Sequence, residues 1–367
     1  MKALLDIHFS DVSDPRSNRN QRHPFLTLVG TTLCAGLSGI DSFSGIADFT
    51  ESHLDGLSDY FDFPHGCPSH DTYQRFWDAI SPDSFLNAFE SFTQSLEKLA
   101  SDIISIDGKT IRNSGKNSAH HVVSAWCESN QLILAQEKVD VKSNEITAIP
   151  KLLKLLDLSG CIVTIDAMGA QRKICDQIIT QGGDYQISLK GNQGSLLDDI
   201  KTFLKDPIVS NSLLVSEEND KGHGRIEQRT AFVTDDIDWL QEHHQWPGLK
   251  SIGMVISKVE RAGKETQETR FYISSLPADA RKFNQIARAH WGIENKLHWR
   301  LDVVFNEDKA CIRNDNASYN MDIIRKWALN TLQKAKTKPD QSIKSIMRKN
   351  SMSFKNLKGT VNKIFHA

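Results

Sequence analysis

The sequence lacks the features of secreted and membrane proteins. Its six cysteines lie far apart and form no C-x-x-C pair, which argues for reduced thiols and against a structural zinc site. The longest weakly polar run, from Leu26 to Ile40, contains polar side chains and is too short to cross a membrane. The N-terminus has no basic segment followed by an apolar one, as a secretory signal would. These absences predict a cytoplasmic protein with no membrane partner.

Internal repeats and low-complexity stretches are also missing. The 367 residues are 39% hydrophobic and 25% charged, close to the average for soluble globular proteins. This composition excludes a collagen, a disordered chain and a small disulfide scaffold. The length is sufficient for two or three domains.

The formal net charge of −2 conceals an uneven distribution of charge. From Met321 to Ala367 there are 11 Lys and Arg against 2 Asp and Glu, so the preceding 320 residues are strongly acidic. A basic segment on an acidic remainder favours a polyanionic partner, and a solvated helical tail is the alternative. Between Asp41 and Asp102, 12 acids accompany only two basic residues, so this region does not attract phosphates through its overall charge.

The spacing of apolar residues changes along the chain. Residues 24–100 have helical spacing, and Ser81-Pro82 is typical of a helix start. Short apolar runs then predict an antiparallel hairpin combined with parallel crossovers, in an α/β layer. The expected strands are 102–107, 121–126, 132–139, 161–166 and 185–189, with helices over 146–156 and 171–181. An inserted sheet is expected over 210–276, before a long helix that begins at Ala278.

Two of the predicted strands end in an aspartate. Asp107, followed by Gly108 as a turn, closes the first strand, and Asp166 closes the fourth. Carboxylates at neighbouring strand ends can converge on Mg²⁺, and Glu294, in the apolar part of the last helix, is a suitable third acid. The alternative for either aspartate is a structural role in a turn or a helix cap.

Four motifs resemble those of a known family. They are IDGKTIR (106–112), VTIDAMGAQ (163–171), GGDYQISLKGNQ (182–193) and HWGIENKLHWRLDVVFNEDKACIR (290–313). Together they resemble the IS4-like DDE transposases, most closely the ISAs1 or H-repeat-associated group of bacteria. The resemblance implies an RNase H-like core with Asp107, Asp166 and Glu294 as its metal-binding, catalytic triad. It also implies a β-rich insertion between Tyr185 and Glu294.

The expected fold is therefore α/β. It combines an RNase H-like mixed sheet with helices on both faces, interrupted by a β-rich insertion, and an all-α N-terminal domain. We expect the helical domain over 1–100 and the first part of the catalytic core over 101–205. The insertion follows over 206–277, the last part of the core with the Glu294 helix over 278–330, and a basic C-terminal tail over 331–367.

The resemblance implies two-metal phosphoryl transfer on DNA. Two Mg²⁺ ions, or Mn²⁺ as a substitute, are expected in each active site, with Asp107 bridging both ions and Asp166 and Glu294 holding one each. The expected activity is strand cleavage and strand transfer at insertion-sequence ends. The partners are double-stranded DNA, as terminal inverted repeats and target, and a second copy of the chain in a homodimer on DNA. The expected location is the bacterial cytoplasm, at the nucleoid when DNA is bound.

Basic and polar residues near these motifs are candidate DNA contacts. The wider IS4 signature has Tyr, Arg and Lys where this chain has Ala287, His290 and Leu301, so nearby residues are assigned the basic roles. For each residue the alternative is an ordinary surface charge. Arg225 shares a predicted strand face with Glu227 and Arg229, so a cross-strand ion-pair ladder is a further alternative there. The candidates are Lys109, Arg112, Arg172, Lys190, Asn192, Arg225, His290, Lys296 and Arg300.

Particular residues exclude two other kinds of site. An aspartyl phosphatase needs a nucleophilic Asp where Ser105 stands, and His290 and His298 lack further ligands for zinc. Two alternatives stay open, an inactive transposase-derived DNA-binding protein and a DDE nuclease without strand transfer. The intact Asp-Asp-Glu set argues against the first, and the sequence does not separate the second from a transposase.

Overall fold

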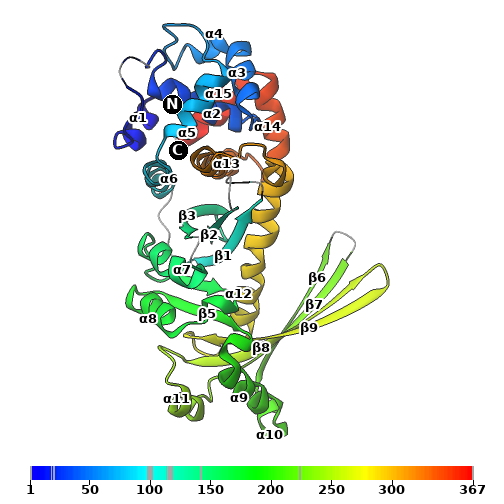
Figure 1. Ribbon diagram of the computed structural model, residues 1–367. Coiled ribbons are helices and arrows are strands. Elements are labelled where there is room, and N and C mark those ends of the chain that lie inside the picture. Colours follow the sequence, from blue (N-terminus) through cyan, green and yellow to red (C-terminus); the bar gives the residue numbers. More distant parts are fainter. Residues whose placement is uncertain are drawn as a thin grey trace.

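Helices gather at one end of the molecule, a mixed sheet lies in the middle, and long β-hairpins project to one side (Figure 1). This computed structural model describes residues 2–17, 19, 21–96, 102–112, 114, 119–140, 143–222 and 225–365. Among these residues, no helix is both long and apolar enough to span a bilayer.

The described residues before the first strand form helices. The helical spacing expected over 24–100 is found from Phe25 to Leu96, and 97–100 lie outside the described residues. Ser42 and Ser69 accept hydrogen bonds from backbone N–H groups in the first turns of two of these helices, a typical N-cap arrangement. The helices are α1 (Lys2–Phe9), α2 (Phe25–Gly36), α3 (Phe43–Ser52), α4 (Leu54–Leu57), α5 (His70–Ala79) and α6 (Pro82–Leu96).

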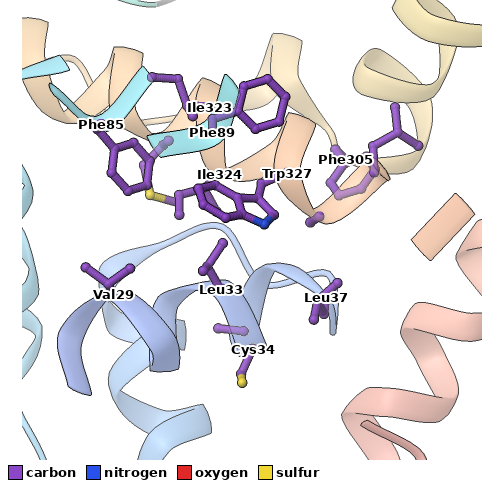
Figure 2. Packing of buried hydrophobic residues seen from close by; sticks show 14 of the residues in the cluster. Val29, Leu33, Cys34, Leu37, Phe85, Phe89, Phe305, Ile323, Ile324 and Trp327 are labelled. Carbon is purple, nitrogen blue, oxygen red and sulfur yellow. The ribbon is translucent and has the colours of Figure 1, made fainter. Parts of the chain in front are cut away.

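The last three α-helices, from the other end of the chain, pack into this helical region. They are α13 (Asp315–Lys334), α14 (Ile343–Met352) and α15 (Phe354–Phe365). Figure 2 shows Ile324 and Trp327 of α13 opposite Val29 and Leu33 of α2. Residues 331–367, expected as a tail, therefore form the end of α13 and two helices that share the helical core. Their spacing of apolar residues explains this packing, because each helix has a continuous apolar side.

A single mixed sheet of nine strands runs from the middle of the molecule into the projecting hairpins. Its strand order is β3-β2-β1-β4-β5-β9-β8-β7-β6. Strands β1, β4 and β5 are parallel to one another, and the remaining neighbours are antiparallel. The strands are β1 (Ile103–Ile111), β2 (His120–Cys127), β3 (Leu132–Val139), β4 (Ile162–Ile165), β5 (Asp184–Leu189), β6 (Leu214–Gly222), β7 (Arg225–Thr234), β8 (Ser251–Arg261) and β9 (Lys264–Ser274).

Helices cover both faces of the β1–β5 part of the sheet. Alternate residues of β2 show this directly, since Val122 belongs to the helical core and Val123 to a second core on the opposite face. The second core contains α7 (Glu145–Lys154), α8 (Arg172–Thr180) and α9 (Gly194–Lys205). The short α10 (Pro207–Ser210) and α11 (Asp238–His244) complete this side.

The segment 210–276 is rich in strands, as expected for the insertion. Its strands extend the main sheet, because β9 pairs with β5 through residues 271–274. The sequence interpretation missed α9 and α11, and it ended the first strand too early. β1 continues to Ile111 because β2 pairs with it over that whole length.

The long helix expected from Ala278 begins at Ala280 as α12 (Ala280–Gly292), where Asp279 accepts a hydrogen bond from the Lys282 N–H. After Gly292 it widens into π-helical turns over Ile293–His298 and Arg300–Val304. Turns of this kind are rare and often occur at functional sites.

Candidate active site

Three acidic side chains come from elements that meet at one edge of the sheet. Asp107 lies inside β1, at the point where the pairing with β4 ends. Asp166 follows the last residue of β4, and its Oδ1 accepts a hydrogen bond from the Met168 N–H. Glu294 lies in the first π-helical turn after α12. The sequence predicted Asp107 at a strand end. In the structure it lies inside β1, at the end of the parallel pairing with β4.

Hydrogen bonds place α12 across one face of the parallel strands. The hydroxyl of Ser105 on β1 donates to the backbone oxygen of Ala289, at 3.3 Å. The side-chain amide of Gln186 on β5 donates to the backbone oxygen of Phe283, at 3.0 Å. Since Ser105 and Asp107 point to the same face of β1, this contact brings the following turn of the helix towards Asp107.

Asp107 carries the most informative electrostatic signal of the site. Burial raises the pKa of its carboxyl from 3.8 to about 7, and the Gly108 N–H only partly offsets this effect. The nearby carboxylates of Glu294, Asp166 and Glu145 raise this pKa further. Among the described residues, no Lys or Arg forms an ion pair with Asp107, Asp166 or Glu294. Negative charge is therefore concentrated here without a basic side chain to offset it.

The donor set fits a hard divalent cation. Mg²⁺ prefers carboxylate oxygens and is held by one or two of them together with water and phosphate oxygens. Within the described part of the chain, no three His, Cys, Asp or Glu side chains already stand close enough to hold an ion. The side chain of Glu294 is exposed and that of Asp166 is half-buried.

Two histidines lie beside the acids in neutral form. The Nδ1 of His298 is 3.6 Å from Oδ2 of Asp107. Burial lowers the pKa of His298 to about 3, with Lys109 and Lys326 contributing, so this contact is not an ion pair. Burial likewise lowers the pKa of His290 to about 4, close to Asp166. His290, expected at the DNA, is therefore an uncharged group packed between α12 and the sheet.

Lys109 and Arg112 follow Asp107 on β1 and its turn, but their environments differ. Lys109 is largely buried and forms ion pairs with Asp302 and Glu307. Burial lowers the pKa of its amine, yet these two acids outweigh that effect and raise it overall. Arg112 is exposed and pairs with Asp308 at 3.2 Å. Of the two side chains, only that of Arg112 can be reached by DNA without breaking a buried contact.

Three further candidates lie beyond β4 and β5. Arg172 is exposed at the start of α8, with its guanidinium 5.8 Å from the ring centre of Trp246. Lys190 is exposed directly after β5. The amide of Asn192 donates to the backbone oxygen of Ala167 at 2.6 Å, so it connects this loop to the residue after Asp166.

Lys296 and Arg300 contact the turn between β2 and β3 instead of lying free. The amine of Lys296 pairs with Glu128, and the guanidinium of Arg300 donates to Oε1 of Gln131 at 2.8 Å. Glu128 also lies against Gly292, where an added Cβ would be 2.2 Å from its Oε2. These contacts hold the helix that carries the third acid against the sheet.

Arg225 lines a cavity of about 250 Å³ between the β7–β9 strands and α12. It pairs with Glu227 at 3.4 Å, and Glu227 in turn pairs with Arg229 at 2.8 Å. These two pairs run along β7, and Arg229 adds a cross-strand pair with Glu218 of β6, at 3.3 Å. On the α12 side of the cavity, the Arg270 guanidinium lies 3.9 Å from the ring centre of Trp291.

The sequence interpretation missed two acids near Asp107. Glu145, at the start of α7, pairs with His121 at 2.6 Å on the opposite face of β1. An added Cβ on Gly108 would be 2.1 Å from Oε1 of Glu145, so Gly108 is a strand residue that leaves room for this acid and not a turn. Glu307 is fully buried, and burial and Asp322 raise its pKa. A sequence signal existed only for Glu307, which belongs to the fourth motif.

Comparisons with known proteins identify the family of the chain. Residues 7–93 match the family model described as DDE_Tnp_1-associated, and residues 98–331 match the model described as Transposase DDE domain. The chain is 41% identical over 346 residues to "H repeat-associated putative transposase YhhI" of Escherichia coli strain K12, covering 90% of each chain. It is 38% identical to "Putative transposase YncI" of Escherichia coli O157:H7, covering 92% of this chain and 88% of that one. A solved piggyBac transposase synaptic complex with hairpin DNA aligns with a TM-score of only 0.43 and 10% identity, over 99% of this chain and 78% of that one, which is too low to support an argument.

Proposed function

This chain belongs to the DDE transposases of the H-repeat-associated group, and we propose that it cleaves and transfers DNA strands at insertion-sequence ends with Asp107, Asp166 and Glu294 as its catalytic acids. A transposase of this family is a nuclease and polynucleotidyl transferase. Beyond this general activity, we propose the DNA ends as substrate, the three acids as the catalytic triad and divalent metals as cofactors.

One observation supports the triad most directly. The carboxyl of Asp107 is buried and lies among other acids, with no Lys or Arg paired to the three acids in the described part of the chain. Removing a carboxylate from water among like charges is unfavourable unless a cation joins it. Divalent cations bound here would offset this cost.

We assign β1–β5, with α7, α8 and α12, to an RNase H-like core. The strand order β3-β2-β1-β4-β5, with a parallel β1-β4-β5 part, supports this assignment. The proposed divisions remain 1–100, 101–205, 206–277, 278–330 and 331–367, although the last segment packs with the N-terminal helices.

Asp107 would contribute oxygens to both ions, and Asp166 and Glu294 would each contribute to one. Two bound Mg²⁺ ions, or Mn²⁺ in their place, would stabilise charge on the attacking and leaving oxygens. The other residues maintain the arrangement of these acids. Ser105 and Glu128 position the helix that carries Glu294, and neutral His298 packs against Asp107 without neutralising it.

Double-stranded DNA, as terminal inverted repeats and as target, is the proposed substrate. The exposed side chains of Arg112, Arg172 and Lys190 are suited to phosphate contacts near this edge of the sheet. Because two ends must be brought together, we propose a homodimer on DNA. The proposed place of action is the bacterial nucleoid.

The test uses a DNA fragment that carries the gene's own flanking sequences, incubated with Mg²⁺. Wild type should cut at discrete repeat boundaries, and Asp166→Ala should reduce the rate by roughly a thousandfold or more. Asp235→Asn, an exposed site away from the triad, is the control and should cut normally.

The same assay separates the alternatives. DNA that is retarded on a gel but never cut would replace the proposal with an inactive DNA-binding protein. Cut ends that never join to a target would replace it with a DDE nuclease without strand transfer.

A further inference from the structure

The helices α14 and α15 form a basic surface far along the chain from the three acids. No Asp or Glu occurs from Gln341 to Ala367, although the segment is rich in Lys and Arg. In Figure 1, both helices lie at the helical end of the molecule. The basic residues on them are Lys344, Arg348, Lys349, Lys355, Lys358 and Lys363.

This helical pair is docked firmly and is not a solvated tail. The buried amide of Asn350 donates to the backbone oxygen of Leu37, at 3.0 Å, and its Oδ1 accepts from the Thr360 hydroxyl, at 2.9 Å. Phe354 fills the space left by Gly56, where an added Cβ would lie 2.3 Å from its ring. These contacts fix the positions of both helices, so their charges are presented on a defined surface.

Four of the cations are exposed and unneutralised. Within the described residues, Lys344, Arg348, Lys349 and Lys355 form no ion pair with any acid, and we call these four the basic surface. Lys358 differs, because it approaches Asp59 at 3.8 Å. The neighbouring helical region is rich in acids, so the absence of pairing does not reflect a shortage of carboxylates nearby.

Like charges held on a rigid surface repel one another, and an external polyanion removes that repulsion. Lys344 and Arg348 are four residues apart and therefore lie on the same side of α14. The surface is formed by exposed helix sides, and it is rich in lysine, a flexible point charge. These properties suit a phosphodiester backbone and not a small ligand or a base edge.

We infer that the basic surface on α14 and α15 binds the backbone of double-stranded DNA outside the active site, without reading its sequence. This inference rests on the proposed function, because it takes DNA as the polyanion. It assigns a second DNA contact, which stabilises the bound state without touching the reacting phosphate.

The experiment measures the salt dependence of DNA binding by the full chain, in EDTA, with a short duplex of mixed sequence as probe. A basic-surface variant carries Lys344→Gln, Arg348→Gln, Lys349→Gln and Lys355→Gln. A control variant removes the same charge at four exposed lysines elsewhere, namely Lys154→Gln, Lys205→Gln, Lys250→Gln and Lys282→Gln. Thermal melting of both variants checks that they are folded.

Each phosphate contact contributes about 0.9 to the slope of log affinity against log salt. If all four cations contact phosphate, the slope of the basic-surface variant should be smaller than that of the control by about 3.6. Between about 50 and 200 mM salt, wild type would then lose roughly 150-fold more affinity than the variant does. A slope reduced by at least about 0.9 relative to the control supports the inference, and a smaller difference overturns it.

Failure of this inference and failure of the proposed function are distinguishable. Binding is measured without metal, so it does not depend on cleavage, and Asp166→Ala should bind the duplex as wild type does. Gel filtration without DNA tests whether the surface instead joins two copies of the chain. A change of oligomeric state in the basic-surface variant, with an unchanged salt slope, would overturn the inference in favour of a protein interface.

Discussion

Replacing Asp107 by asparagine should make the metal-free protein more stable at alkaline pH. The carboxyl has a pKa of about 7 in the folded protein, against an ordinary value of 3.8. Because the unfolded chain releases this proton first, stability falls as the pH rises from about 4 to about 7 and then levels off. Asparagine carries no charge, and its oxygen can still accept the hydrogen bond from the Gly108 N–H.

The expected magnitude follows from the size of this pKa difference. About three pKa units correspond to a cost of about 4 kcal/mol for the ionised carboxylate at pH 8, and to about half of that near pH 5.5. The free-energy difference between Asp107→Asn and wild type should therefore grow with pH up to about pH 7. Added Mg²⁺ should stabilise wild type at pH 8 and have a much smaller effect on the variant, because binding to the folded state adds to stability.

Urea denaturation followed by tryptophan fluorescence, in EDTA at several pH values, measures this difference. Asp235→Asn, an exposed aspartate outside the site, is the matched control and should follow wild type at every pH. The reasoning would be refuted by an Asp107→Asn variant that is no more stable than wild type at pH 8. It would equally be refuted by a stability difference that does not change between pH 5.5 and pH 8.

Three further changes test the packing beside Asp107 and in the helical core. Gly108→Ala places a methyl group 2.1 Å from Oε1 of Glu145 and should lower the free energy of unfolding, measured in urea, by roughly 1–3 kcal/mol. The double variant with Glu145→Ala should recover most of this loss, and a loss that is not recovered would contradict the clash. Asn330→Ala removes the side chain that forms hydrogen bonds with the backbone N–H and C=O of Ile133 on the edge strand β3, at 2.9 and 2.8 Å. The free energy of unfolding should fall by about 2–3 kcal/mol, and equal hydrogen-exchange protection at Ile133 in both proteins would argue against this prediction. Trp327→Ala should cost about 3–5 kcal/mol of unfolding free energy, because the ring is stacked in the helical core; a loss below about 1 kcal/mol would show that this core is not tightly packed.

Most elements were predictable because their signals are local. The hairpin of β2 and β3, the helices α7, α8 and α12, and Asp166 directly after β4 lie where the spacing of apolar residues places them. The end of β1 was wrong, because its length depends on a partner strand and not on its own residues. The inserted strands were found, but a local pattern does not show that β9 would pair with β5.

The candidate site divides in the same way. The three acids were predicted from residue type and motif, and their catalytic role stays a prediction, whereas the contacts of the basic candidates depend on residues far away in the chain. Lys109 looked like a DNA contact, but it is paired with Asp302 and Glu307, nearly 200 residues later. Arg225 could be assigned to either of two roles from sequence, and the structure pairs it with Glu227 of the same strand, while its contact with DNA stays a prediction.

The sequence by itself determined the family and the order of most elements, and it supplied the three acids as a prediction, because motifs and apolar spacing are properties of short segments. Tertiary structure alone decided that the elements carrying these acids come together, and that Asp107 is buried enough for its pKa to rise to about 7. It also decided that the basic C-terminal segment packs against the N-terminal helices while four of its cations stay in solvent. Burial and pairing depend on which distant segments come together, and no local pattern contains that information.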